Sequence, residues 1–368
     1  MRFSILYLLV ILQIIFFLPV SGNDFLEITD SDSRKSIINK PVKNVLCSGP
    51  GCLRLLTYLQ SQNMICGVDS LEIRDVISID RPYSLANKQF KTLSIFGEFR
   101  GHDNAELILS LETQPQIIFK TFSNSMGLNA EKLQNRTSIP VISLNYGDFI
   151  QKRKKFYNSL RLMASVIDKK QRAEEIIKFF ENCIIDLNKR TSGITERPTV
   201  YLGGVAYKGP HGFQSTELLY PPFVLTNVKS LIDEIPSRNK KITNSVINKE
   251  KILEMDPDYI FLDLSTIQLN SHKGGINELK NDPIFNSLKA VEAGNVYGIL
   301  PYNSYSINYG SIIANSYFIG KILYPENFKD IDPVKKSDEI YSFLVDSPVF
   351  NEMNKSFDNL IFSRIDLK

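Results

Sequence analysis

One pattern of apolar and polar residues occurs twice along the chain, once in each half. The first copy, at 104–119, starts Asn-Ala-Glu-Leu-Ile-Leu, and the second, at 248–262, starts Asn-Lys-Glu-Lys-Ile-Leu. An Asn before a periodic apolar stretch caps a short helix, a Pro ends it, and the run rich in Ile and Phe that follows indicates a buried strand. Each copy therefore predicts a helix that leads into a parallel strand. The alternative is that two generic units match by chance, and the shared start argues against it.

Shorter apolar runs predict the other elements of the first half. These are a strand at 42–47, a turn at 48–51, a helix at 52–60, and strands at 64–68 and 141–144. Ligands of parallel sheets bind at the carboxyl ends of the strands, so the 48–51 turn is expected to face a ligand. Residues 23–41 are polar and are predicted to lead into this lobe without strands.

Apolar residues recur at helical spacing through 151–190. As one helix of ~38 residues, this segment would be about 57 Å long, which is the length of a two-lobed molecule and not of one lobe. A polar break at 168–170 leaves open whether the helix is interrupted once. Strands are expected again at 199–202 and 296–300, and a helix from 337 onward.

These elements predict an α/β protein with two Rossmann-like lobes, each with a parallel central sheet, joined by a long α-helix. The expected boundaries are 23–150 for the N-terminal lobe, 151–192 for the interlobe helix and 193–368 for the C-terminal lobe.

The first 22 residues have the features of a secretory signal peptide. Arg2 precedes an apolar run at 5–17, and small residues follow it up to Gly22. The run is shorter than the about 20 residues that span a bilayer, which makes an uncleaved anchor the weaker alternative. We therefore expect a secreted protein at the extracytoplasmic face of the cell membrane.

Composition excludes several classes of protein. The net charge of +3 is spread along the chain, which argues against nucleic-acid binding. The histidines at 102, 211 and 272 are too few and too dispersed for a dedicated metal site. Cysteines at 47, 52, 66 and 183 are predicted to be buried thiols, and a bond between the first and third is the less favoured alternative.

The order of several loose motifs over nearly the whole mature chain resembles one known family. They are Lys40-Pro41-Val42, Gly67-Val68-Asp69, the two Asn-x-Glu helices, the long helix between them, and the run 285–297. The chain resembles the periplasmic-binding-protein family of ABC importers for iron–siderophore complexes, haem or cobalamin. The resemblance implies a ligand held between two lobes that a rigid helix joins, and an ABC permease dimer with its ATPase subunits as partners. This chain lacks the cysteine that anchors many such proteins after the signal, and the segment 303–309 matches no particular ligand class.

Candidate ligand-binding residues follow the predicted strands of both lobes. Glycine allows close approach of the backbone, and aromatic and cationic side chains suit a large, partly anionic chelate. The candidates are Tyr207, Lys208, His211 and Phe213 in the glycine-rich segment 203–216, Tyr302 and Tyr305 after the last strand, and Ser48, Arg100 and Phe122 in the first lobe. The alternatives are a glycine loop without function, a solvated Arg100, and hydrogen-bonded surface histidines in place of axial ligands. We expect neither a resident metal nor a cofactor of the protein's own.

Glu106 and Glu250 occupy the same position in the two repeated helices. A carboxylate in the first turn of a helix is stabilised by the helix dipole, which is the simpler interpretation. The resemblance implies instead that these glutamates dock onto arginines of the permease, one per subunit.

A monomeric solute receptor that captures an iron chelate or a tetrapyrrole-type or corrinoid-type ligand is the favoured function. A secreted two-lobed enzyme, with His102 and Glu98 as acid and base, is the second interpretation. A surface adhesion module is the third, and the chain has no repeats of the kind such a module needs.

Overall fold

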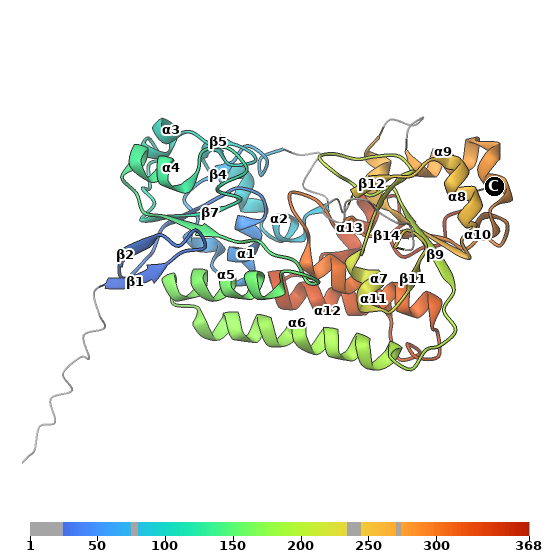
Figure 1. The fold of residues 1–368 in the computed structure, drawn as a ribbon. Coiled ribbons are helices and arrows are strands. Elements are labelled where there is room, and N and C mark those ends of the chain that lie inside the picture. Colours follow the sequence, from blue (N-terminus) through green and yellow to red (C-terminus); the bar gives the residue numbers. More distant parts are fainter. Residues whose placement is uncertain (1–24, 75–79, 234–243, 270–273, 368) are drawn as a thin grey trace, which may run out of the picture.

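The computed structural model describes residues 25–74, 80–233, 244–269 and 274–367, which form two lobes side by side (Figure 1). The predicted signal peptide at 1–22 lies outside the described residues. Within the described part of the chain, none of the helices has both the length and the apolar character that crossing a membrane requires.

The N-terminal lobe contains the expected parallel sheet, in the order β3-β7-β8. Its strands are β3 (Val45–Ser48), β7 (Ile117–Thr121) and β8 (Val141–Leu144), and every residue in them is buried. Helix α1 (Cys52–Tyr58) follows β3, and the first repeat copy forms α3 (Ala105–Leu109) and β7. Helices α3 and α4 (Ala130–Thr137) pack together near β5 and β8. The predicted βα order of this lobe is confirmed.

Two predictions for this lobe are wrong. Residues 23–41 contain an antiparallel hairpin of β1 (Phe25–Thr29) and β2 (Lys35–Asn39), which Asp30 stabilises by accepting from the Arg34 amide at 2.9 Å. The strand expected at 64–68 is a 3-10 turn at Gln62–Met64 followed by the short β4 (Val68–Asp69). β4 pairs with β5 (Ile95–Glu98), which also pairs with β6 (His102–Asp103), so these strands form a separate small sheet.

The C-terminal lobe is built on a second parallel sheet, in the order β11-β9-β13-β14. The strands are β11 (Lys229–Ser230), β9 (Thr199–Gly203), β13 (Tyr259–Asp263) and β14 (Val296–Ile299). A two-stranded antiparallel sheet of β10 (Ser215–Glu217) and β12 (Asn244–Val246) lies beside it. The helices are α7 (Pro221–Leu225), α8 (Lys249–Met255), α9 (Gly275–Asn281) and α10 (Lys289–Glu292). The second repeat copy is thus α8 followed by β13, as the sequence predicts.

The connector is a pair of helices, not one long helix. α5 (Arg153–Val166) and α6 (Lys170–Thr191) are separated at Asp168, whose φ of 57° lies in the left-handed region. α5 folds back along α6, and Arg161 of α5 bonds to Glu174 of α6 at 2.6 Å. Only α6, which is about 33 Å long at 1.5 Å per residue, runs from one lobe to the other (Figure 1). The connector is therefore shorter than a single helix would make it.

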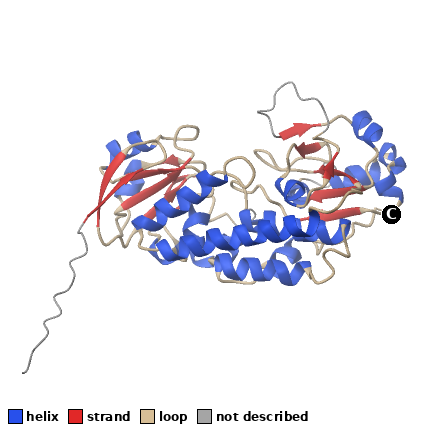
Figure 2. Ribbon diagram, turned by 60° about the horizontal axis from the view of Figure 1, so that its bottom comes forward, coloured by secondary structure: helices blue, strands red, loops and turns tan. Residues whose placement is uncertain are grey.

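The C-terminal helices also join the lobes. α11 (Tyr309–Leu323) packs on α6, α7 and α12 (Pro333–Val345), and α12 in turn contacts both α1 and α2 (Pro82–Ala86) of the first lobe. The last helix is α13 (Phe350–Ser356). Figure 2 shows that helices line one side of the molecule, below the sheets of both lobes.

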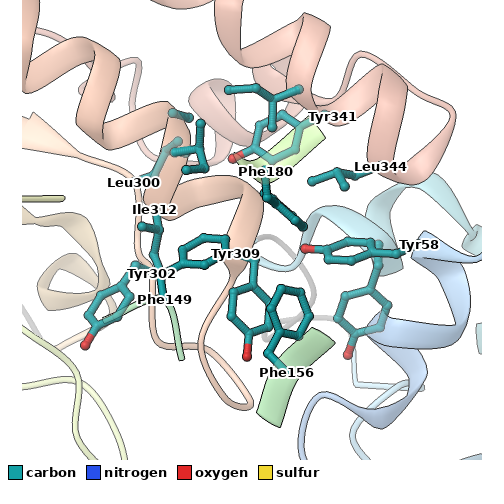
Figure 3. Packing of buried hydrophobic residues seen from close by; sticks show 14 of the residues in the cluster. Tyr58, Phe149, Phe156, Phe180, Leu300, Tyr302, Tyr309, Ile312, Tyr341 and Leu344 are labelled. Atoms are coloured by element: carbon teal, nitrogen blue, oxygen red, sulfur yellow. The ribbon is translucent and has the colours of Figure 1, made fainter. Parts of the chain in front are cut away.

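The hydrophobic core is continuous across the two lobes. Tyr309, at the start of α11, stacks on Phe156 of α5 with ring centroids 3.8 Å apart, and Phe149 and Phe180 surround the pair (Figure 3). Separating the lobes would therefore expose aromatic surface, which holds their relative position.

All four cysteines are free thiols, as the sequence predicts. Cys47, Cys52 and Cys183 are buried, and Cys66 is half-buried.

Candidate ligand-binding cleft

A cleft of about 500 Å³ lies between the lobes. Its walls are loops that follow the carboxyl ends of strands, which is where ligands of open parallel sheets bind. From the first lobe they contribute Pro50, Leu71, Arg74, Asp80, Phe99, Arg100, Phe122 and Met126. From the second lobe they contribute residues 206–210 after β9, Ser265 and Gln268 after β13, and residues 303–306 after β14.

Five of the predicted site residues line this cleft. They are Arg100, Phe122, Tyr207, Lys208 and Tyr305. The predicted 48–51 turn contributes Pro50. Gly51 in this turn has a φ of 75°, and a Cβ there would lie 2.2 Å from the ring of Tyr146, so only glycine fits.

Ser48 and Phe213 do not reach the cleft, because both side chains are fully buried. The Ser48 hydroxyl donates to Asp103 at 2.6 Å and accepts from the Lys120 ammonium at 2.9 Å, next to a buried ion pair between those two residues. Phe213 packs edge-on against Tyr201 and Phe285 in the core of the second lobe. The predictions that Ser48 and Phe213 contact a ligand are therefore wrong, because both side chains lie in the protein interior.

Tyr302 and His211 also lie outside the cleft lining. Tyr302 is buried, and its hydroxyl donates to the carboxylate of Glu217. Burial raises the pKa of Glu217 to about 8. The ring of His211 lies 2.7 Å from the Tyr207 carbonyl and so orients the loop that carries Tyr207.

The cleft combines cations with aromatic rings. The guanidinium of Arg74 lies 4.6 Å from the ring centre of Phe99, and that of Arg100 lies 5.1 Å from the same ring. On the opposite wall, the Lys208 ammonium lies 5.4 Å from the ring of Tyr207. Such rings orient the cations without neutralising them, but the Glu98 carboxylate, 3.7 Å from the guanidinium of Arg74, offsets part of that charge. An anionic group between the walls would therefore be attracted chiefly by Arg100 on one side and Lys208 on the other.

Asp80 is the acidic residue of the lining, and its carboxylate is held by polar side chains of the second lobe. Its carboxylate accepts from the Ser304 hydroxyl at 2.7 Å and from the Gln268 amide at 3.3 Å. Burial raises the pKa of Asp80 above its usual range, while the neighbouring Arg81 and the bonds from Ser304 and Gln268 act in the opposite direction. The sequence reasoning did not identify Asp80, Arg74 or Phe99, because the short strands β4 and β5 that precede them carry no long apolar run.

The segment 303–308 of the second lobe is held by the first lobe at the base of the cleft. The Tyr305 hydroxyl donates to Asp69 and accepts from the Arg100 amide at 2.9 Å. Burial, followed by the nearby Glu72, raises the pKa of Asp69 to about 7. Beneath the loop, the buried Arg54 donates to the carbonyls of Ser304 at 2.8 Å and Ile307 at 2.9 Å. The floor of the cleft is thus fixed relative to both lobes.

Glu106 and Glu250 are exposed, in the first turns of α3 and α8. Both helices lie at the top of Figure 1, on the side of the molecule opposite α6. Among the described residues, neither carboxylate forms an ion pair.

The structure does not bring the proposed acid and base into the cleft. Glu98 and His102 are exposed partners on β5 and β6, beside a surface depression of the first lobe. No group of three or more His, Cys, Asp or Glu side chains suited to a metal ion occurs within the described segments.

Comparison with known proteins gives a consistent result. A family model described as periplasmic binding protein matches residues 104–302, which is more than half of the 368-residue chain. No curated protein matches the sequence.

Three solved structures share the fold. A periplasmic solute binding protein from Veillonella parvula has 16% identity and a TM-score of 0.68, with coverage of 92% of this chain and 98% of that one. The TroA-like periplasmic binding protein FepB from the same organism has 22% identity and a TM-score of 0.64, with coverage of 87% and 96%. The molybdate periplasmic binding protein MolA of Haemophilus influenzae, bound to molybdate, has 18% identity and a TM-score of 0.65, with coverage of 88% and 98%.

Proposed function

The chain belongs to the periplasmic binding protein family, and on this basis we propose that it captures an anionic metal chelate in the interlobe cleft and delivers it to an ABC importer. An iron–siderophore complex, haem or a corrinoid is the ligand class that we infer. The protein would act at the extracytoplasmic face of the membrane, where the family works. The observation that carries the proposal is a cleft of about 500 Å³ in which cations from both lobes lie against aromatic rings.

The charges of the cleft favour an anionic ligand. Arg74 and Arg100 lie on one wall and Lys208 on the other, whereas Asp80 is buried and engaged in hydrogen bonds. The related Haemophilus influenzae protein is bound to the anion molybdate, which supports an anion-binding role for this fold. The rings of Phe99, Phe122, Tyr207 and Tyr305 offer flat apolar contact that molybdate would not use, and so they favour a larger chelate.

A binding screen tests this proposal. We would measure thermal shifts and then dissociation constants for haem, cyanocobalamin, ferric siderophores of the catecholate and hydroxamate types, and molybdate. The double variant Arg100→Gln with Lys208→Gln should weaken binding of the selected ligand by about tenfold or more, because charge-assisted contacts are lost on both walls. Lys335→Gln, at a side chain that is 87% exposed on α12, is the matched control. Equal affinity in the double variant and the control would reject the cleft as the binding site.

Glu106 and Glu250 are proposed to dock the loaded protein onto the permease dimer. Their exposure, their equivalent positions in the two lobes and their placement on one side of the molecule support this role. Paired charges at such a surface act mainly on association and orientation. We expect Glu106→Ala with Glu250→Ala to leave ligand affinity unchanged and to abolish stimulation of the transporter ATPase in reconstituted membranes.

The matched control for docking is Glu131→Ala with Glu254→Ala, which removes two other glutamates from helices of the same two lobes. Normal stimulation by the docking variant would leave Glu106 and Glu250 as residues that only stabilise their helices.

A further inference from the structure

A second cavity adjoins the cleft. It has a volume of about 380 Å³ and lies at the carboxyl end of β8. Polar groups line most of it, including Ser143, Asn145, Lys152 and Lys155. The two cavities share two lining residues, Phe122 from the first lobe and Ser306 from the second. These two side chains therefore stand between the cleft and the second cavity.

Both shared residues have an unusual backbone conformation. The φ angles are 54° at Phe122 and 75° at Ser306, in the left-handed region that favours glycine. For a bulky residue such as phenylalanine this conformation is a genuine outlier, and it persists only where the surroundings impose it. Three other residues of the cleft, Arg100, Lys208 and Tyr305, also have a positive φ, so the conformation recurs along the cleft wall, as it does at many ligand-binding sites.

The surroundings of both residues are rigid. The Phe122 carbonyl accepts from the amides of Ser125 at 3.0 Å and Met126 at 3.1 Å, and the Phe122 ring lies 6.1 Å from that of Tyr146. The Tyr146 hydroxyl donates to the Ile307 carbonyl at 2.8 Å, directly after Ser306. The two sides of the boundary are thus connected through Tyr146.

We propose that Phe122 and Ser306 form a partition that sets the size of the ligand the cleft accepts. This inference rests on the proposed function and adds a determinant of specificity to it. With the partition in place, a ligand is confined to the 500 Å³ cleft. Without it, a larger chelate extends polar or anionic arms toward Lys152 and Lys155.

The test compares ligands of different size in matched variants. Phe122→Ala removes the partition, and Phe99→Ala removes a ring that lines only the cleft. With haem as the smaller probe and cyanocobalamin as the larger, Phe122→Ala should change the ratio of the two dissociation constants by about tenfold in favour of the larger probe. Phe99→Ala should weaken binding of both probes by a similar factor, and Phe122→Leu should retain the wild-type ratio.

Ser306→Gly is a second test that keeps the left-handed backbone, and it should move the ratio in the same direction as Phe122→Ala. If the wild type binds a probe and neither variant changes the ratio, the partition is rejected while the proposed function stands. If no probe binds the wild type, the proposed function fails, and the crystal structure of Phe122→Ala then decides on the partition. If the cleft and the second cavity are joined in that structure, the partition is supported. If a shifted Tyr146 still separates the two cavities, the partition is rejected.

Discussion

Replacement of Arg54 in α1 should weaken the contact between the two lobes, although the residue belongs to the first lobe alone. The side chain is 1% exposed, and it donates to the carbonyls of Ser304 at 2.8 Å and Ile307 at 2.9 Å in the second lobe. Among the described residues no carboxylate pairs with it, and the ring of Tyr83 lies 5.1 Å from its guanidinium carbon. Its charge is therefore satisfied by backbone carbonyls of the other lobe and by the hydroxyl of Tyr146 in its own lobe.

The size of the effect follows from these bonds. Hydrogen bonds to a charged group contribute about 1.5–3 kcal/mol each, and stranded buried acceptors add their own cost. The removal of a buried charge recovers part of the cost of its desolvation. For Arg54→Met we expect a loss of about 3 kcal/mol in the free energy of unfolding. Arg54→Lys should give an intermediate loss, because one ammonium does not span the carbonyls of Ser304 and Ile307.

The assay is urea unfolding combined with amide hydrogen exchange. The Asn308 amide, which donates to the Tyr302 carbonyl at 2.7 Å, should exchange faster in Arg54→Met. Arg161→Met is the control, since its pair with Glu174 is 47% and 57% exposed and should cost less than about 1 kcal/mol. Equal unfolding free energies for the two variants, with unchanged exchange at Asn308, would refute the reasoning and assign the loop's position to aromatic packing alone.

Two further predictions concern pH and motion. Burial raises the pKa of Asp263 to about 7, so the folded state keeps a proton that the unfolded state, with a pKa of about 4, releases. The free energy of unfolding should therefore fall as pH rises from about 4 to 7. In Asp263→Asn this decrease should be smaller, by roughly 4 kcal/mol at most. Urea unfolding at several pH values measures the difference. Because α6 and the helices α11 and α12 join the lobes, small-angle scattering should show little change in the radius of gyration on loading, and a contraction of several ångströms would contradict this.

Strands β3, β7, β8, β9, β13 and β14 of the two parallel sheets were predictable because each contains a short run of buried apolar residues. The edge strand β11, a Lys-Ser pair, was not predicted, because it has no apolar residue. The hairpin β1–β2 was not identified, because each strand buries a single residue, Ile28 or Ile38, and other apolar residues in it, such as Phe25 and Ile37, are exposed. The break between α5 and α6 was visible as a polar segment, but the reversal of direction at Asp168 depends on packing of α5 against α6.

The location of the cleft was predictable from the sequence, but the side chains that line it were predictable only in part. A glycine-rich segment after a strand indicates the loop that faces a ligand, yet Tyr207 points outward while Phe213 fills the core between Tyr201 and Phe285. Arg54 gave no local signal, because its partners lie some 250 residues later in the chain. Long-range partners of this kind decide which charged residues are structural and which are available to a ligand.

The continuous core determines how this cleft can recognise a ligand. Tyr309 and the helices behind it tie the lobes together, and Arg54 and Tyr305 fix the floor between them. Because the lobes are already in place, little binding energy is spent on moving them, in contrast to proteins whose lobes close around their ligand. Selectivity for a ligand must instead arise from the side chains that line the preformed cleft. The side chains of Tyr207 and Lys208 are exposed, whereas the half-buried ring of Phe122 lies against that of Tyr146, and this difference makes the partition the firmer determinant of ligand size.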